Sequence, residues 1–291
     1  VMEVSLGWEH ACAIKKSDKT VWCWGKNDSA QLGVEQTTKL SSEPIQVKLP
    51  GAARSISAGS AHTCAVLEDS TAWCWGKGSN GQLGNGGLDQ KVSPTQVVGP
   101  DYTPQTDAGT QDSGTKTVLD GVISVTSGAA QSCALRTNGI AYCWGSCKFG
   151  EMGDGRTGDV NCMQAYPKQV PLPNVKQISS GVFNVCATTS ASMGYCWGRD
   201  DWGQSGNGAM IAGSLSQPGG LGIATQVAAL GTDVVSMNPG YNHACALLKD
   251  STVKCWGRNK VYQLGNGVTT DPTDPEKNNS LLPVTSVAAC Q

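Results

Sequence analysis

The sequence carries little charge, few aromatic residues and only three histidines. Charged residues make up 15% of the chain and aromatic residues 6%, and the formal net charge is −2 at pH 7. No run of basic residues is present. Nucleic acid is therefore not an expected partner, because its binding proteins carry a cationic stripe. No stretch reaches the roughly 18 apolar residues of a membrane-spanning helix, so we expect no membrane span.

The residue patterns of catalytic and metal sites are also absent. The sequence has no Ser-His-Asp order, no Cys-His nucleophile pair and no phosphate loop leading into a helix. The cysteines lack the Cys-x-x-Cys knuckles that are typical of zinc sites. Two aspartate-rich stretches, Asp101–Asp120 and Asp271–Asp274, lack the alternating pattern of a dedicated calcium loop. We predict a protein that is not an enzyme and has no metal or cofactor, with calcium binding by these stretches left open.

Glycine, by contrast, is abundant, and much of it belongs to an internal repeat. The 37 glycines suit many short strands joined by tight turns. Five segments share a glycine, then His, Gln or Asn three residues later, a cysteine, a turn and the tripeptide Cys-Trp-Gly. They are Gly7–Gly25, Gly59–Gly76, Gly128–Gly145, Gly181–Gly198 and Gly240–Gly257. A loop such as Gly81–Gly86 and a strand such as Pro94–Val97 follow each segment. Four short strands per repeat are typical of a propeller blade.

The repeat therefore predicts an all-β fold, a β-propeller of about five four-stranded blades. Residues 1–291 are expected to form a single domain with insertions at 99–117 and 147–162. The first strand, Val1–Leu6, and the last, near Pro283–Val287, carry complementary parts of one repeat. Because a propeller is stable only when its blades stack on one another, we expect these two strands to share a blade and close the ring.

The 13 cysteines follow the repeat. Two cysteines, 10 or 11 residues apart, flank the turn of each segment, so they lie opposite each other in a predicted hairpin. The predicted cross-strand disulfides are Cys12–Cys23, Cys64–Cys74, Cys133–Cys143, Cys186–Cys196 and Cys245–Cys255. We pair Cys147 with Cys162 as a sixth bridge, which leaves Cys290 unpaired or available to another chain. This use of cysteine indicates a secreted, periplasmic or cell-surface protein.

The pattern GxxHTCAVxxDSxxWCWGxxxxGQLGNG resembles the repeat of the regulator of chromosome condensation family. The resemblance recurs five times and implies a propeller. The best-known members have seven blades, so the alternative is a partial set from a seven-bladed ring. Nuclear members are exchange factors for a small GTPase and bind chromatin, whereas a secreted bacterial relative inhibits β-lactamases through its propeller face. The paired cysteines are similar to those of the secreted bacterial versions.

Two kinds of repeated residue are expected to be structural. The histidines His10, His62 and His243 share one repeat position with Gln131 and Asn184, so a hydrogen-bonding role is favoured over proton transfer or metal binding. The Cys-Trp-Gly tryptophans recur with the fold and are expected to pack between blades.

Irregular aromatic residues are the binding candidates. Trp8, Phe183 and Tyr241 lie in the loop after the repeat glycine, next to Glu9 and Asn242. Such loops on a rigid scaffold are typical of protein interfaces. We predict an extracellular scaffold that binds a protein partner or copies of itself through these loops.

A second candidate is the loop that holds Asp200, Asp201 and Trp202. An exposed tryptophan beside carboxylates is suited to stacking on a sugar ring. A carbohydrate-binding surface module is therefore the alternative function.

Overall fold

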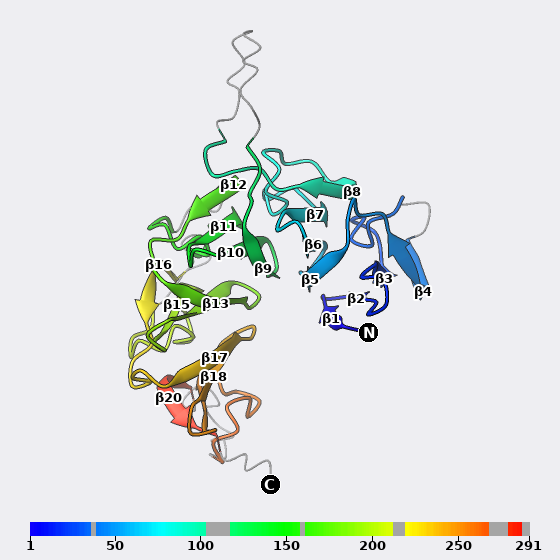
Figure 1. Ribbon diagram of the computed structural model, residues 1–291. Helices are drawn as coiled ribbons and strands as arrows, with labels where there is room; N and C mark the ends of the chain where they lie inside the picture. Colours follow the sequence, from blue (N-terminus) through cyan, green and yellow to red (C-terminus); the bar gives the residue numbers. More distant parts are fainter. Residues whose placement is uncertain (36–38, 103–116, 158–160, 212–218, 268–278, 287–291) are drawn as a thin grey trace. The chain divides into compact units, whose positions relative to one another are not determined.

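The computed structural model describes residues 1–35, 39–102, 117–157, 161–211, 219–267 and 279–286. This part of the chain consists of strands and turns and contains no helix. Twenty strands form five four-stranded antiparallel sheets, each made from four consecutive strands (Figure 1). The predicted set of five four-stranded blades is confirmed.

The five sheets follow the five repeats. The first sheet contains β1 (Glu3–Leu6), β2 (His10–Ile14), β3 (Val21–Lys26) and β4 (Leu40–Val47). The second contains β5 (Ala53–Ala58), β6 (His62–Leu67), β7 (Ala72–Gly76) and β8 (Lys91–Gln96). The third contains β9 (Val122–Ser127), β10 (Gln131–Arg136), β11 (Ala141–Ser146) and β12 (Met163–Gln169). The fourth contains β13 (Val175–Ser180), β14 (Asn184–Thr189), β15 (Gly194–Arg199) and β16 (Gly220–Gln226). The fifth contains β17 (Val234–Pro239), β18 (His243–Leu248), β19 (Val253–Gly257) and β20 (Ser280–Thr285).

The chain divides into two compact units. Unit 1 comprises Val1–Asn138, Tyr142–Ser146 and Met163–Gln169, and so holds the first two sheets and most of the third. Unit 2 comprises Gly139–Ala141, Cys147–Cys162 and Val170–Gln291, and holds the fourth and fifth sheets. The single domain expected from the repeat stays a prediction.

The prediction that the first and last strands share a blade is wrong, and closure of the ring stays a prediction. In the described part of the chain, β1 pairs with β2 in the first sheet and β20 pairs with β19 in the fifth. Each repeat supplies all four strands of its own sheet, so neither terminal strand completes the sheet of the other. The partial set from a seven-bladed ring stays a prediction.

All six predicted disulfides are present. In the five cross-strand bridges the Cα atoms of the two cysteines lie 4.1 Å apart. In the first sheet Cys12 is the direct register partner of Cys23, as the turn between them predicts. Cys147 and Cys162 join the two ends of a loop in unit 2. Cys290 lies outside the described residues.

Four of the Cys-Trp-Gly tryptophans connect their sheet to the preceding repeat. The indole Nε1 of Trp75 donates a hydrogen bond to the Gln31 carbonyl at 3.0 Å, and Trp75 is fully buried. Trp144, Trp197 and Trp256 bond in the same way to the carbonyls of Gln82, Glu151 and Gln204, each at 2.9 Å. The loop glycine two residues later is required, because a Cβ on Gly84 would lie 2.7 Å from Trp144 Nε1. The predicted packing role of these four tryptophans is confirmed.

Two histidines continue this network in unit 1. His10 Nε2 lies 2.9 Å from Thr63 Oγ1, and the Thr63 hydroxyl donates to the Gln31 carbonyl at 2.9 Å. Since the one hydroxyl proton is used there, His10 Nε2 must donate to Thr63. His62 and the Ser132 hydroxyl repeat the arrangement in the next pair of sheets. These contacts confirm the predicted hydrogen-bonding role of His10 and His62.

Candidate functional site: an aromatic–arginine cluster

The same backbone contact brings two variable positions together in every sheet. The residue after Cys-Trp-Gly donates its N–H to the carbonyl of the second residue after the repeat glycine, at 2.7 to 2.9 Å. The five pairs are Lys26–Glu9, Lys77–Ala61, Ser146–Ala130, Arg199–Phe183 and Arg258–Asn242. The glycine between them permits the contact, because a Cβ on Gly198 would lie 2.5 Å from the Phe183 carbonyl. Each sheet therefore presents a pair of side chains at equivalent places.

In unit 2 this pairing builds a stack of aromatic rings around one guanidinium, which we name the aromatic–arginine cluster. Its members are Phe149, Phe183, Arg199, Asp201 and Tyr241. The Phe183 ring centroid lies 5.1 Å from that of Phe149 and 5.8 Å from that of Tyr241. The Arg199 guanidinium lies 5.2 Å from the Phe149 centroid and 5.8 Å from the Phe183 centroid. The rings and the cation hold one another in place through edge-to-face and cation–π contacts.

Asp201 completes the cluster by pairing with the guanidinium. Arg199 Nε lies 2.9 Å from both Asp201 carboxylate oxygens, and Nη2 lies 2.5 Å from Oδ2. Both side chains are largely buried, with 20% and 22% of their surface exposed. Burial acts to lower the pKa of Arg199, but Asp201 and the Tyr241 hydroxyl raise it above its usual range. The cluster therefore exposes an aromatic surface around a cation that is already neutralised.

A second stack lies close by in the same unit. The Arg258 guanidinium lies 4.3 Å from the Trp202 ring centroid. The backbone N–H of Arg258 donates a hydrogen bond to the backbone carbonyl of Asn242, the residue after Tyr241. The Asn242 side chain is buried, with 5% exposed, and so is held within the fold. The loop predicted to bind a sugar thus lies next to the aromatic loop, with a cation over its tryptophan.

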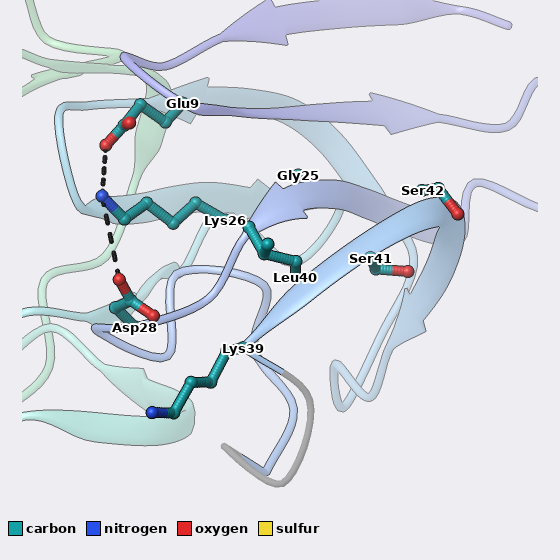
Figure 2. A pocket seen from close by; sticks show the side chains of 8 residues that line it. All are labelled: Glu9, Gly25, Lys26, Asp28, Lys39, Leu40, Ser41 and Ser42. Carbon is teal, nitrogen blue, oxygen red and sulfur yellow. Dashed lines mark hydrogen bonds and ion pairs between the residues drawn. The ribbon is translucent and has the colours of Figure 1, made fainter.

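The remaining predicted binding residues lie in unit 1. Trp8 is 67% exposed, and the neighbouring Glu9 carboxylate accepts a hydrogen bond from Lys26 Nζ at 2.7 Å. Lys26 also lies 3.7 Å from Asp28, and its side chain points between the two carboxylates (Figure 2). These groups border a pocket of 640 Å³. It is lined by Glu9, Gly25, Lys26, Asp28, Lys39, Leu40, Ser41 and Ser42 (Figure 2). Joint action of Trp8 with Phe183 and Tyr241 stays a prediction.

Asp200 is placed differently from the exposed carboxylate that sugar binding requires. It is fully buried, and its Oδ1 accepts a hydrogen bond from the Ser205 N–H at 2.8 Å. Asn27 and Asn259 make the same loop contact in the first and fifth repeats, at 3.0 Å. Asp200 Oδ2, where the asparagines carry an NH₂ group, has no hydrogen-bond partner in the described structure. Burial raises the Asp200 pKa to about 6.

We expect Asp200→Asn to stabilise the protein at pH 7.5 by about 1–3 kcal/mol, because the neutral amide removes a buried charge. The folded pKa of Asp200 is raised, so its charge destabilises above pH 6 and its protonation restores stability as the pH falls. The gain should therefore shrink at pH 5. Urea unfolding at both pH values measures it, with Asn259→Asp as the reciprocal control. A stability loss in Asp200→Asn at pH 7.5 would contradict this account.

Phe149 and Arg199 are not among the binding residues predicted from the sequence. Arg199 could have been found, because the position after Cys-Trp-Gly is basic in four repeats, as Lys26, Lys77, Arg199 and Arg258. Phe149 could also have been found, because alignment of the repeats places it at the loop position of Trp202, and both N–H groups donate to the side chain two residues later. No group of three or more possible metal ligands occurs among the described residues. Nor does this part of the chain contain a helix with the length and apolarity of a membrane span. Most of Asp101–Asp120 and all of Asp271–Asp274, where calcium binding was left open, lie outside it.

The similarity of this chain to known proteins lies in its repeats. Family models described as the regulator of chromosome condensation (RCC1) repeat match residues 3–31, 53–82 and 233–263, and residues 18–66 and 69–135. The chain is 30% identical over 236 residues to the ultraviolet-B receptor UVR8 of Arabidopsis thaliana, covering 77% of this chain and 46% of that protein. It is 27% identical over 274 residues to the human E3 ubiquitin-protein ligase HERC2, covering 92% of this chain and 5% of that protein.

Solved structures show the same fold. The crystal structure of Prp20p from Saccharomyces cerevisiae matches with a TM-score of 0.78 at 18% identity, over 99% of this chain and 63% of that one. That structure was described together with the binding of Prp20p to Gsp1p and histones. The chain thus spans about half or less of the curated relatives named above and about two thirds of this structural neighbour.

Proposed function

The chain belongs to the regulator of chromosome condensation repeat family, and from that premise we propose that it is a non-enzymatic protein-binding module. The aromatic–arginine cluster forms part of its contact surface. Binding to other proteins is consistent with the relatives, since Prp20p binds Gsp1p and histones. The single observation that carries the proposal is the Tyr241 ring, 46% exposed on a rigid stack with Phe183 and Arg199.

The chemistry of the cluster favours a protein surface over nucleic acid. The Arg199 guanidinium is paired with Asp201, so it offers little free positive charge to phosphate, and the Lys148 ammonium is engaged with the Phe149 ring, 5.3 Å from its centroid. Tyrosine and arginine are enriched among the residues that contribute most to protein interfaces. Pre-organised rings also lose little side-chain entropy when a partner covers them.

We propose that this binding takes place outside the cytosol. The six disulfides support this, because such bridges persist in oxidising compartments and are rare in reducing ones. A secreted, periplasmic or cell-surface scaffold is the role that combines this redox requirement with a protein-binding surface.

The carbohydrate alternative has no observation in its favour. Trp202 carries the Arg258 guanidinium over its ring, and the Asp200 carboxyl is buried. Trp202→Ala on a glycan array remains its direct test.

Site-specific photo-crosslinking tests the proposed surface. A photo-reactive phenylalanine analogue at Tyr241 should crosslink to one or a few proteins in the extracellular fraction of the source organism. The same analogue at Tyr195, a partly exposed position on β15, serves as the matched control. We expect adducts that form only at position 241, identified by mass spectrometry.

Tyr241→Ala should then weaken binding of the captured protein at least tenfold, because a central aromatic anchor typically contributes more than about 1.4 kcal/mol. Tyr195→Ala should leave binding within about twofold of wild type. Identical adducts at both positions, or unchanged affinity in Tyr241→Ala, would exclude the cluster as the contact surface.

A further inference from the structure

Phe149 reaches the aromatic–arginine cluster from a different repeat than the other members. It lies in the loop between β11 and β12 of the third sheet, whereas the other members come from the fourth and fifth repeats. The backbone of this loop rests directly on β16 of the fourth sheet, because a Cβ on Gly220 would lie 2.0 Å from the Phe149 carbonyl oxygen. The position of the Phe149 ring therefore depends on how the loop is held.

In the other repeats one residue at the start of this loop holds it in place. Asn27, Asp200 and Asn259 are each the second residue after Cys-Trp-Gly, and the Oδ1 atom of each accepts the N–H five residues later, at 2.8 to 3.0 Å. The second repeat has Gly78 there, which permits direct backbone contact, because a Cβ on it would lie 2.1 Å from the Asp89 carbonyl oxygen. Four loops are thus fixed at their start by a side-chain cap or by a close backbone contact.

The third repeat has Cys147 at this position, with a disulfide in place of the cap. A bridged cysteine carries no oxygen that could accept the N–H of Met152, five residues later. Instead, Cys147 is bonded to Cys162, with their Cα atoms 5.1 Å apart, and its N–H donates to the Cys162 carbonyl at 3.1 Å. Phe149 is only two residues from this anchor. The bridge therefore does for the third loop what the asparagine side chains do for the first and fifth.

This bridge can be opened without breaking a sheet. Cys147 directly follows β11 and Cys162 directly precedes β12, so both cysteines lie outside the strands. Cys162 is partly exposed, whereas nine of the ten cysteines in the cross-strand bridges are at most 4% exposed, Cys245 being the exception. Thiol–disulfide exchange requires a thiolate to reach a sulfur atom. A reductant should therefore open this bridge before those of the other four sheets' buried cysteine pairs, Cys12–Cys23, Cys64–Cys74, Cys133–Cys143 and Cys186–Cys196.

We propose that the Cys147–Cys162 bridge is a redox switch of the aromatic–arginine cluster. The reductant is a dithiol, whose first thiolate attacks Cys162 Sγ and displaces the Cys147 thiolate, and whose second thiol then displaces Cys162. The dithiol is oxidised to a disulfide, and its two electrons and two protons pass to the two cysteines, which become thiols. The loop then has neither bridge nor cap, and the Phe149 ring leaves its contacts with Phe183 and Arg199.

Release of Phe149 changes the contact surface without unfolding the sheets. The Arg199 guanidinium keeps its pairing with Asp201 but loses the ring that lies 5.2 Å away. Partner binding should therefore weaken on reduction, and this consequence rests on the proposed function. The release of the loop itself does not depend on that function, so the two can be tested separately.

Hydrogen exchange of the full chain, followed by mass spectrometry, tests the release of the loop. In the oxidised protein the N–H groups of Gly150 and Gly153 donate to the carbonyls of Cys147 and Gly150, at 3.1 and 3.0 Å, and should be protected. In the double variant Cys147→Ala with Cys162→Ala they should exchange roughly tenfold faster or more, because the loop opens locally more often. Unchanged exchange in this variant would overturn the proposal.

Two controls show whether the bridge itself is responsible. The equivalent N–H groups of Gly81 and Gly84 in the second repeat donate at 2.7 and 3.0 Å and should exchange at the wild-type rate. Cys147→Asn with Cys162→Ala supplies the cap of the first and fifth repeats, so it should restore protection of the third loop and make it insensitive to dithiothreitol. Circular dichroism establishes that each variant is folded.

Graded reduction of the wild-type protein tests the switch without any substitution. Dithiothreitol at rising concentration, quenched by alkylation, should label Cys147 and Cys162 before any cysteine of the first, second and fourth sheets, with the circular dichroism signal retained. Earlier labelling of those cross-strand cysteines would overturn the proposal.

Binding of the protein captured at Tyr241 separates the switch from the proposed function. The double alanine variant should bind it about fivefold more weakly or worse, and the Cys147→Asn variant should bind as wild type does. Weak binding by Tyr241→Ala together with normal binding by the double alanine variant would overturn the switch. Normal binding by both, with a released loop, would refute the contact surface and leave the control of the loop by the bridge standing.

Discussion

Reduction of the disulfides should unfold the protein in neutral buffer without denaturant. Each cross-strand bridge closes a loop of about 11 residues, and loop-closure entropy assigns it about 3 kcal/mol. Five such bridges together match or exceed the 5–15 kcal/mol by which domains are usually stable. We expect loss of the β-sheet circular dichroism signal after a strong reductant, and recovery of folding only on reoxidation.

Removing the disulfide of a single blade measures how much one bridge contributes to the free energy of unfolding. The double variant Cys64→Ala with Cys74→Ala should lower the free energy of unfolding by about 3 kcal/mol, measured by urea unfolding of the oxidised protein. Alkylation under denaturing, non-reducing conditions is the control. Alkylation should label at most one of the 13 cysteine sulfurs, because the other twelve are in disulfide bridges. Ten or more labelled sulfurs, or an unchanged unfolding curve after reduction, would contradict the bridged structure.

The disulfides and sheets could be predicted because they depend on short-range patterns that recur. Cys64 and Cys74 are placed opposite each other by one turn, and the same spacing returns in every repeat, so each copy supports the others. Whether Val1–Leu6 shares a blade with the last strand could not be predicted from a short-range pattern of this kind. It depends on how many complete strand sets the chain holds, and β4 already supplies the fourth strand of the first sheet.

The candidate site was predicted in part. Phe183 and Tyr241 stood out because they interrupt the repeat, and the structure places their rings in contact. Arg199 was missed because it belongs to the repeat pattern, and its importance comes from the side chains that face it across the sheet. Asp200 was predicted to take part in sugar binding beside Trp202, and the structure places it in a buried loop position. Alignment with Asn27 and Asn259 reveals its capping position, but its burial depends on the loop conformation.

Mild acid should destabilise the protein through two buried histidines. Burial lowers the pKa of His10 to about 4 and that of His62 to about 3, against about 6.5 in an unfolded chain. A base whose folded pKa is depressed is destabilising once the unfolded form takes up a proton, so stability is lost as the pH falls below 6.5. Between pH 6.5 and pH 5 each histidine should cost about 2 kcal/mol.

The chain offers its own control for this effect, since Gln131 occupies the histidine position in the third repeat. His10→Gln with His62→Gln should therefore fold and lose most of the acid sensitivity in urea unfolding between pH 7.5 and pH 5. Asp200, with its pKa raised to about 6, acts in the opposite direction, so the double variant should become slightly more stable as the pH falls below 6. Adding Asp200→Asn should remove that remaining slope. An unchanged acid response in the double variant would mean that the protons are taken up elsewhere, and that the neutral His10–Thr63 and His62–Ser132 hydrogen bonds do not control it.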